Sequence, residues 1–130
     1  MEYIFISSNQ QLDLFPENTW YDFQVQLPKE IIFKHKYECA LLLFDVNPLF
    51  QLTVNVFCDI LEDICFEDNL YPLLCNILEV PYRSNKPIFF PLKVNTLNRF
   101  RISIKRAFTN STPTESIEQS SFLLMFREIK

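Results

Sequence analysis

The amino-acid sequence predicts an all-β protein with a single domain, a β-sandwich that spans residues 1–130. Short segments alternate apolar and polar residues, which is the pattern of strands with one buried face. Clusters of Pro, Asn, Asp and Ser separate these segments, and none of them predicts a helix convincingly. A chain of 130 residues has room for one hydrophobic core and not for a second.

Eight strands are expected, and alternation of apolar and polar residues supports several of them. In the seventh, Phe100, Ile102 and Ile104 would face the core, while Arg101 and Lys105 would face solvent. The expected strands span 2–7, 22–27, 30–34, 38–46, 52–61, 72–80, 98–106 and 121–128.

Three local features add to this pattern. Most of the eight prolines sit at expected strand ends, where a missing backbone N–H does least harm. Segment 40–44 is apolar on both faces, so it is either a central strand with a covered outer surface or part of a subunit contact, and the contact is favoured. Segment 109–115 is polar and is expected to form an exposed loop.

Composition and charge narrow the classes of function. The 14 phenylalanines predict a core filled by large rings. A net charge of −4 removes the long-range attraction on which non-specific nucleic-acid binding depends, so no direct nucleic-acid partner is expected. A basic strip in the seventh strand is interpreted as its solvent face. The strip consists of Arg99, Arg101, Lys105 and Arg106.

The sequence contains neither of the usual marks of membrane insertion or secretion. No run of about 18 apolar residues is present, so no membrane span is expected. Residues 1–11 lack the basic leader and the long apolar stretch of a signal peptide. The protein is therefore expected to be made in the cytoplasm or nucleus and not to be secreted by a signal peptide.

No residue pattern points to catalysis, a cofactor or a metal, and the chain is not expected to be an enzyme. The single histidine, His35, lies in a charged turn without a nucleophile nearby in the sequence. The four cysteines lack the paired spacing of a zinc site and are expected to be buried free thiols, with a Cys58–Cys75 bridge left open. An acidic cluster near residues 62–68 lacks the ligand spacing of a calcium loop.

Blocks of residues near both ends and in the middle of the chain resemble one protein family. The blocks contain Phe15, Pro16, Asn18, Phe23, Leu27 and Pro28, then Cys58, Asp59, Pro72, Leu73 and Leu74, and finally Phe126 and Arg127. In this order and spacing they are similar to the single jelly-roll minor capsid (penton-like) proteins of Polinton (Maverick) and adintovirus-like elements. The chain departs from that family in having no Gly, which the family often carries after the Cys-Asp-Ile strand.

The resemblance implies a fold, an eight-stranded antiparallel jelly roll, which also fits the strand count. An immunoglobulin-like sandwich is the competing topology, but its disulfide and Trp signature is absent. Within the family blocks a structural role is expected, with Asp59 as a carboxylate at a strand end that accepts backbone hydrogen bonds.

The resemblance also implies a function, that of a vertex (penton) subunit in a virion. Five copies would form a ring through heterologous contacts and would bind a major capsid protein. Interfaces of this kind need apolar centres. The candidate contributors are Phe15, Trp20, Phe50, Phe89 and Phe90.

Two alternatives stay open. A ligand-binding or receptor-attachment jelly roll would present an exposed aromatic platform, for which segment 18–21 is the candidate. A host genome could instead have retained such a gene for another role, because fold and ancestry do not determine present function. Self-assembly, as opposed to monomeric ligand binding, distinguishes the capsid subunit from the attachment module.

Overall fold

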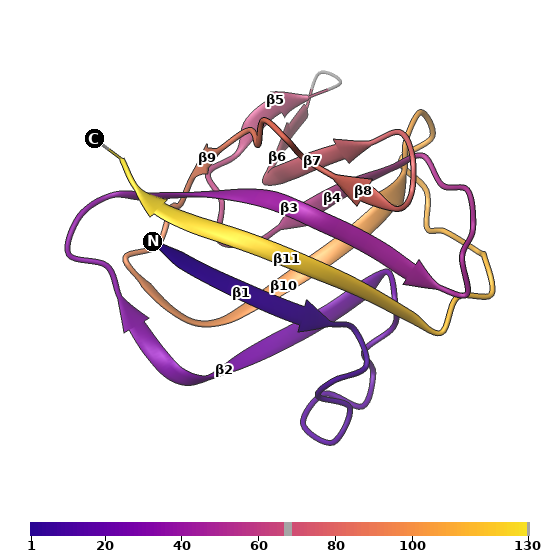
Figure 1. The fold of residues 1–130 in the computed structure, drawn as a ribbon, viewed down its shortest axis with the longest axis horizontal. Coiled ribbons are helices and arrows are strands. Elements are labelled where there is room, and N and C mark those ends of the chain that lie inside the picture. The colour runs from indigo at the N-terminus through magenta and orange to yellow at the C-terminus, as the bar shows by residue number, and fades with distance from the viewer. Residues whose placement is uncertain (67–68, 130) are drawn as a thin grey trace.

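A computed structural model describes residues 1–66 and 69–129, which form strands without any helix. The protein is therefore all-β. Its sheets are antiparallel, and the two large ones form a β-sandwich (Figure 1). The strands are β1 (Glu2–Ser7), β2 (Asp22–Ile32), β3 (Tyr37–Asn47), β4 (Val54–Cys58), β5 (Ile64–Phe66), β6 (Asn69–Tyr71), β7 (Leu73–Ile77), β8 (Tyr82–Arg83), β9 (Phe90–Pro91), β10 (Thr96–Arg106) and β11 (Gln119–Glu128). No helix in this part of the chain is long and apolar enough to cross a membrane.

The strands are divided between two packed layers. The first sheet has the order β1-β11-β3-β8, with β9 also paired to β3, and the second has the order β2-β10-β4-β7. A separate hairpin consists of β5 and β6. We call the first layer sheet A and the second sheet B; in Figure 1 the strands β1, β11 and β3 of sheet A lie in front of β2 and β10 of sheet B.

The pairing is nested along the chain. β1 pairs with β11, β2 with β10, β3 with β8, and β4 with β7. Two further pairings, β3 with β11 and β4 with β10, join these pairs into the two sheets. Most connections between consecutive large strands therefore cross from one sheet to the other, whereas β4 and β7 are neighbours in sheet B.

Aromatic rings from both layers fill the space between the sheets. The ring of Phe122 on β11 lies 5.6 Å from that of Phe23 and 4.8 Å from that of Phe44. All three side chains are buried. Rings at these separations contribute about 0.5–1.5 kcal/mol per pair beyond the area that they bury. The expectation of a core of large rings is therefore confirmed.

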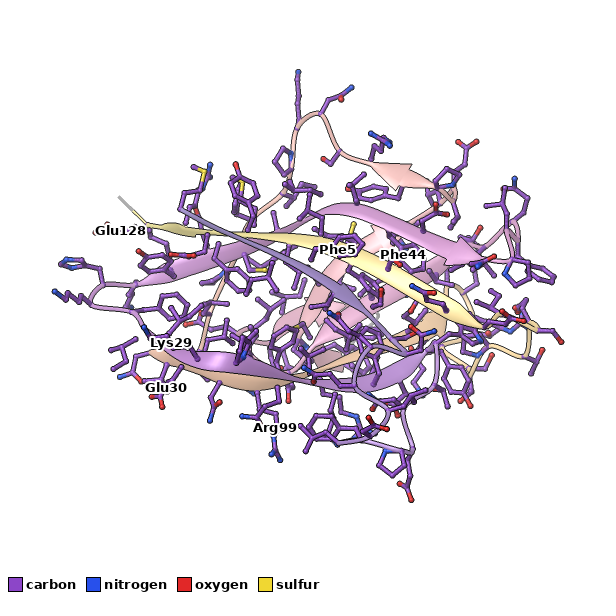
Figure 2. The ribbon with its side chains drawn as sticks, turned by 60° about the horizontal axis from the view of Figure 1, so that its bottom comes forward. Phe5, Lys29, Glu30, Phe44, Arg99 and Glu128 are labelled. Carbon is purple, nitrogen blue, oxygen red and sulfur yellow. The ribbon has the colours of Figure 1, made fainter. Side chains whose placement is uncertain are left out.

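The polar face of sheet B points to solvent as the alternation predicts. On β10, Phe100 and Ile102 are buried, whereas Arg99 and Arg101 are exposed. Figure 2 shows Arg99 and, on β2, Glu30 projecting away from the body of the sandwich. Arg99 and Arg101 thus belong to the solvent face of the strand, whereas Lys105 and Arg106 at its end are half-buried.

The two strands expected at 22–27 and 30–34 form the single strand β2. Proline was interpreted as a strand end, but Pro28 lies inside β2. Between the pairs Arg99 with Gln26 and Leu97 with Ile31 the register shifts, and Pro28 lies within this irregularity. β2 is also an edge strand, so a residue without an N–H is tolerated there.

The middle of the chain contains more and shorter strands than expected. The expected strands 52–61 and 72–80 are reduced to β4 and β7, and the hairpin of β5 and β6 lies between them. The segment between β7 and β10 contributes β8 and β9, which pair with different parts of β3. Of the acidic residues expected in a charged loop, Glu67 and Asp68 lie outside the described residues.

β4 is buried on both faces, although its alternation suggested one wet face. Val54, Val56 and Cys58 belong to the core, but Asn55 and Phe57 on the other face are buried too. The ring of Phe57 packs 5.4 Å from that of Tyr71 at the end of the hairpin. The inserted hairpin thus covers Phe57, while the side chain of Asn55 accepts a hydrogen bond from that of Asn76 on β7.

Candidate functional site

The loop between β1 and β2 carries the first block of family-like residues, and it is anchored to β11. Ser8 is buried, its N–H donates to the carbonyl oxygen of Ser120 at 2.9 Å, and its Oγ accepts from the N–H of Ser120 at 2.9 Å. The Ser120 hydroxyl in turn donates to the carbonyl oxygen of Trp20 at 2.6 Å. Both ends of the loop are therefore held against the same point of β11.

Side-chain amides of this loop bind the free edge of β2. The Asn18 amide donates to the carbonyl oxygen of Gln24 at 3.0 Å and accepts from the Gln24 N–H at 2.9 Å. The Gln11 amide makes the same pair of bonds with Gln26, both at 2.7 Å. The Thr19 hydroxyl accepts from the Asp22 N–H at 3.1 Å, and the Thr19 backbone N–H donates to the Asp22 carbonyl oxygen at 2.9 Å. These side chains satisfy backbone groups that no neighbouring strand reaches.

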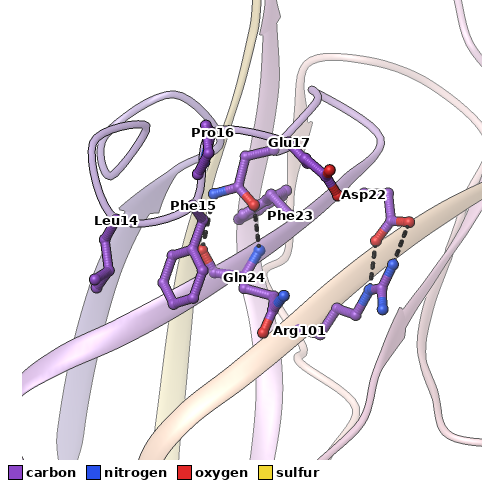
Figure 3. A pocket seen from close by; sticks show the side chains of 9 residues that line it. Leu14, Phe15, Pro16, Glu17, Asp22, Phe23, Gln24 and Arg101 are labelled. Atoms are coloured by element: carbon purple, nitrogen blue, oxygen red, sulfur yellow. Dashed lines mark hydrogen bonds and ion pairs between the residues drawn. The ribbon is translucent and has the colours of Figure 1, made fainter.

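The loop encloses a hollow of about 380 Å³ over β2 and β10. Its lining includes Phe15, Pro16 and Phe23, and also Arg101, whose side chain reaches toward Asp22 (Figure 3). Arg101 donates from Nε and one terminal nitrogen to the two carboxylate oxygens of Asp22, at 2.6 and 2.7 Å. These hydrogen bonds and the Asp22 charge raise the pKa of the Arg101 guanidinium above its ordinary value.

The cation that lines the hollow, Arg101, is already paired with Asp22, so it is not free to bind an anionic ligand. Phe15 is also engaged, since the Arg99 guanidinium carbon lies 5.2 Å from the centre of its ring. Arg99 donates to the side-chain oxygen of Gln26 at 2.9 Å. The block from Phe15 to Pro28 therefore ties a loop to a strand, which is a structural task.

The middle block begins at the C-terminal end of β4, with Cys58 and Asp59. Asp59 Oδ1 accepts from the N–H of Arg101 at 2.9 Å, the kind of bond that the sequence predicts for a carboxylate at a strand end. The Cys58 N–H donates to the carbonyl oxygen of Pro72 at 3.0 Å. Leu73 and Leu74 are buried. Asp59 and Pro72 thus hold the end of β4 against β10 and β7.

The thiols of the described residues are all free. Cys39 and Cys58 are fully buried in the core, whereas Cys65 is exposed and Cys75 is half-buried. Burial raises the pKa of the Cys58 thiol to about 12, and it also raises the pKa of Cys39 and Cys75. The expectation that the thiols are buried is right for Cys39 and Cys58 and wrong for Cys65.

The closing block lies on β11. Phe126 is part of the core, and Arg127 points outward and bonds Glu38 with an Nε–Oε1 distance of 2.7 Å. The Arg127 guanidinium carbon also lies 3.4 Å from the centre of the Phe89 ring. Phe89 is therefore half-buried against its own chain.

The candidate interface residues do not gather at one place. Trp20 is only 6% exposed and packs edge-on against Tyr21, so little of its side chain is accessible for a subunit contact. Burial results from the anchoring of the loop to Ser120. Phe90 is half-buried and lines an apolar hollow of about 370 Å³ between the two sheets. Phe50 is 36% exposed and remains accessible.

Segment 18–21, the candidate aromatic platform, is not exposed as a platform. Trp20 is buried, and Asn18 and Thr19 are engaged with the backbone of β2. The accessible aromatic and aliphatic side chains are others, which the sequence analysis did not single out. They include Tyr3, Phe5, Leu49, Leu78, Ile88 and Phe108, each at least 57% exposed. The sequence predicts the strands and loops that carry these residues. It does not show which of the side chains are left uncovered by the rest of the fold.

The described residues do not assemble a recognisable chemical centre. His35 Nε2 lies 3.9 Å from a Glu128 carboxylate oxygen, and its side chain is 67% exposed. Within residues 1–66 and 69–129, His, Cys, Asp and Glu side chains form no group of three that could hold a metal ion. Comparisons with protein-family models, curated proteins and solved structures found no match to this chain.

Proposed function

We propose that this chain is a single jelly-roll minor capsid protein, the vertex (penton) subunit of an icosahedral virus-like particle. Its function would lie in surfaces rather than in chemistry. The proposal includes self-assembly into a pentamer, contact with a major capsid protein, and residence in the virion.

The nested strand pairing is the observation that carries the proposal. In a jelly roll, eight strands form two sheets through two Greek-key connections, so that the first strand pairs with the last and the pairing continues inward. The pairs β1 with β11, β2 with β10, β3 with β8, and β4 with β7 follow this scheme. It requires that β8 and β9 count as one interrupted strand and that β5 and β6 count as an insertion.

The competing immunoglobulin-like topology fits the strand order less well. In a constant-type immunoglobulin sandwich the first and last strands belong to opposite sheets. Here β1 and β11 are hydrogen-bonded neighbours over six residue pairs in sheet A. Jelly rolls are used by capsid proteins, lectins and cupins, so the capsid role within this class rests on the resemblance of the motif blocks.

An apolar patch at one end of the sandwich supports a role in assembly. Register places Val54 beside both Ile77 and Arg106, so the loops 48–53, 78–81 and 107–118 meet at this end. Exposed side chains on these loops form what we call the loop-end patch. It consists of Leu49, Phe50, Leu78 and Phe108, with exposed fractions of 60, 36, 69 and 86%.

The loop-end patch has the character of an interface centre. Singly exposed apolar residues are normal, but exposed apolar side chains on three adjoining loops offer a candidate contact surface. A ring of subunits needs two different patches on each chain, and the loop-end patch provides one of them. It replaces Trp20 in the set of candidate contact residues.

The mass of the untagged protein in solution tests the proposal. Light scattering coupled to size exclusion, over a range of concentration and salt, is expected to show a discrete pentamer. Leu78→Lys should shift the equilibrium to smaller species, because a charge would be buried in the patch. Thr96→Lys is the matched control, since Thr96 is exposed at the other end of β10.

Two results would count against the vertex role. A stable monomer at high concentration that also fails to bind particles of the major capsid protein would remove it. Equal effects of Leu78→Lys and Thr96→Lys on a pentamer would retain the assembly but exclude the loop-end patch as its contact.

A further inference from the structure

The two sheets each leave one long strand at the edge, and the two edges are treated differently. Sheet B ends at β2, and side chains of the preceding loop occupy the outward backbone groups of β2 at Asp22, Gln24 and Gln26. Pro28 removes a further donor from the same edge. Proteins block edge strands in this way to prevent pairing with other chains.

The edge of β1 in sheet A is open by contrast. Residues of an antiparallel pair alternate between facing the partner strand and facing away from it. The Ser8 N–H donates to Ser120 on β11, so the backbone groups of Ser7, Phe5 and Tyr3 face away. The Ser7 carbonyl oxygen accepts from the Gln10 N–H at 3.3 Å, and the Ser7 N–H donates to the Gln10 side-chain oxygen at 3.4 Å. In the described chain, no residue bonds the outward groups of Tyr3 and Phe5.

The side chains beside this edge form an uncharged apolar band on the outer face of sheet A. Tyr3 and Phe5 are 57 and 61% exposed. Across the sheet, Phe5 pairs with Leu123, and Leu123 pairs with Leu43. Leu43 and Leu123 are half-buried, so the band continues over three strands. An open backbone edge therefore lies next to a surface that favours apolar contacts.

The size of the exposed surface indicates what kind of partner fits it. An aromatic side chain has roughly 200 Å² of surface, so Tyr3 and Phe5 together expose roughly 240 Å². A stable complex of two globular proteins buries about 800 Å² on each partner. The edge is thus too small for a free-standing dimer of this chain, but it matches a short extended segment that gains hydrogen bonds as well as apolar contacts.

We propose that the free edge of β1 is a strand-addition site, which takes an extended polypeptide segment of another protein with uncharged, apolar side chains at alternate positions. The segment would bond the N–H and carbonyl groups of Tyr3 and Phe5 and extend sheet A by one strand. Its apolar side chains would lie beside those of Tyr3 and Phe5 on the outer face. This inference does not rest on the capsid role, since it needs only the open edge.

A surrogate strand tests the site. The probe is a synthetic peptide with the sequence of residues 1–8, two added lysines for solubility and a fluorophore. Placed antiparallel with its Tyr3 opposite Phe5, this peptide presents the N–H groups of its own Tyr3 and Phe5 to the edge. Fluorescence anisotropy should show saturable binding. N-methylation of the peptide's Phe5 should weaken binding about tenfold or more, whereas N-methylation of its Ile4 should not.

Variants of the protein give the reciprocal test. Phe5→Pro removes the outward N–H without removing a bond to β11, and Phe5→Ala removes the same ring but keeps the N–H. Phe5→Pro should bind the peptide about tenfold more weakly than Phe5→Ala. If Phe5→Pro does not fold, as judged by circular dichroism, the two N-methylated peptides still decide the question on the unaltered protein.

Three results would overturn the proposal. One is the absence of binding up to about 1 mM peptide. Another is equal binding of the two N-methylated peptides, because the contact would then not involve the backbone. The third is dimerisation of the protein alone that Phe5→Pro abolishes and Phe5→Ala does not, because the occupant would then be a second copy of this chain.

Discussion

The side-chain amide of Asn18 forms two hydrogen bonds with the backbone of Gln24, six residues further along the chain, at 3.0 and 2.9 Å. It occupies the place of a neighbouring strand at the edge of sheet B. A side-chain amide carries a donor and an acceptor on one planar group, so it can bond the N–H and the carbonyl of the same residue. The finding gives the Asn of the first family-like block a physical role that needs no ligand.

Asn18→Ala is therefore expected to lower the free energy of unfolding by about 1–2 kcal/mol, because two backbone groups of Gln24 lose their partner. Asn18→Asp should also destabilise the protein, since a carboxylate keeps the acceptor but repels the carbonyl oxygen of Gln24. Urea unfolding measures both. Asn85→Ala is the control at an exposed Asn. Equal midpoints for Asn18→Ala and Asn85→Ala would contradict this role.

The ion pair between Arg101 and Asp22 should contribute little to stability despite its two short bonds. The side chains are 53 and 36% exposed, so water and salt screen the attraction. Asp22→Asn is expected to cost less than about 1 kcal/mol. Asp13→Asn, at an exposed position of the same loop, is the control.

The dependence on salt separates a screened ion pair from a structural role of Asp22. Urea unfolding at low and high salt should show that the difference between Asp22→Asn and the unaltered protein shrinks as salt is added. A loss of several kcal/mol that salt does not change would show instead that the Asp22 side chain holds the loop in place.

The apolar pattern of the segments and the breaks between them were sufficient to predict most of the large strands. β1, β3, β10 and β11 lie where the sequence places them, to within two residues at each end. The pattern succeeded at Phe100 and Ile102 because burial on one side of a strand is a local property of the chain. It failed for β4, whose second face is buried as well, with Phe57 packed against Tyr71 of the hairpin that follows.

The features that sequence analysis missed depend on contacts between distant segments. Trp20 looked like a loop aromatic free for a partner, but Ser120, a hundred residues away, holds its backbone in place. Gln11 has no local feature that indicates its bonds to Gln26. The sequence pattern predicts a strand end at Pro28. The strand continues through it because β2 is an edge strand, which is visible only in the assembled sheet.

Stability should fall at alkaline pH through the buried thiols. Burial raises the pKa of Cys58 from 9.0 to about 12. The folded state therefore holds this proton more tightly than the unfolded state does. The resulting stability is complete below pH 9 and is lost as the pH rises from there through about 12, with a slope of up to about 1.4 kcal/mol per pH unit for one thiol.

Cys58→Ala isolates that contribution. The variant will be less stable at neutral pH because it leaves a small cavity, so the slopes rather than the absolute values are compared. Urea unfolding under reducing conditions between pH 7 and about pH 11 should give a shallower decline for Cys58→Ala than for the unaltered protein. Parallel declines would mean that Cys58 does not titrate differently in the two states.

Phe108 adopts a left-handed backbone conformation, with φ of 47°, at the start of the loop between β10 and β11. This region is unfavourable by about 1–2 kcal/mol for residues with a Cβ, and least so for Asn and Asp. The side chain is 86% exposed, so burial does not offset the cost. Phe108→Asn should therefore raise the free energy of unfolding by about 1 kcal/mol.

The same substitution separates stability from assembly. Phe108 belongs to the loop-end patch, so Phe108→Asn should weaken the proposed pentamer while it stabilises each subunit, because a large apolar side chain is lost from the contact. Thermal unfolding and light scattering on one sample measure the two effects. If Phe108→Asn raises the stability but leaves the mass of the assembly in solution unchanged, Phe108 does not take part in the subunit contact. The loop-end patch would then lose its most exposed member.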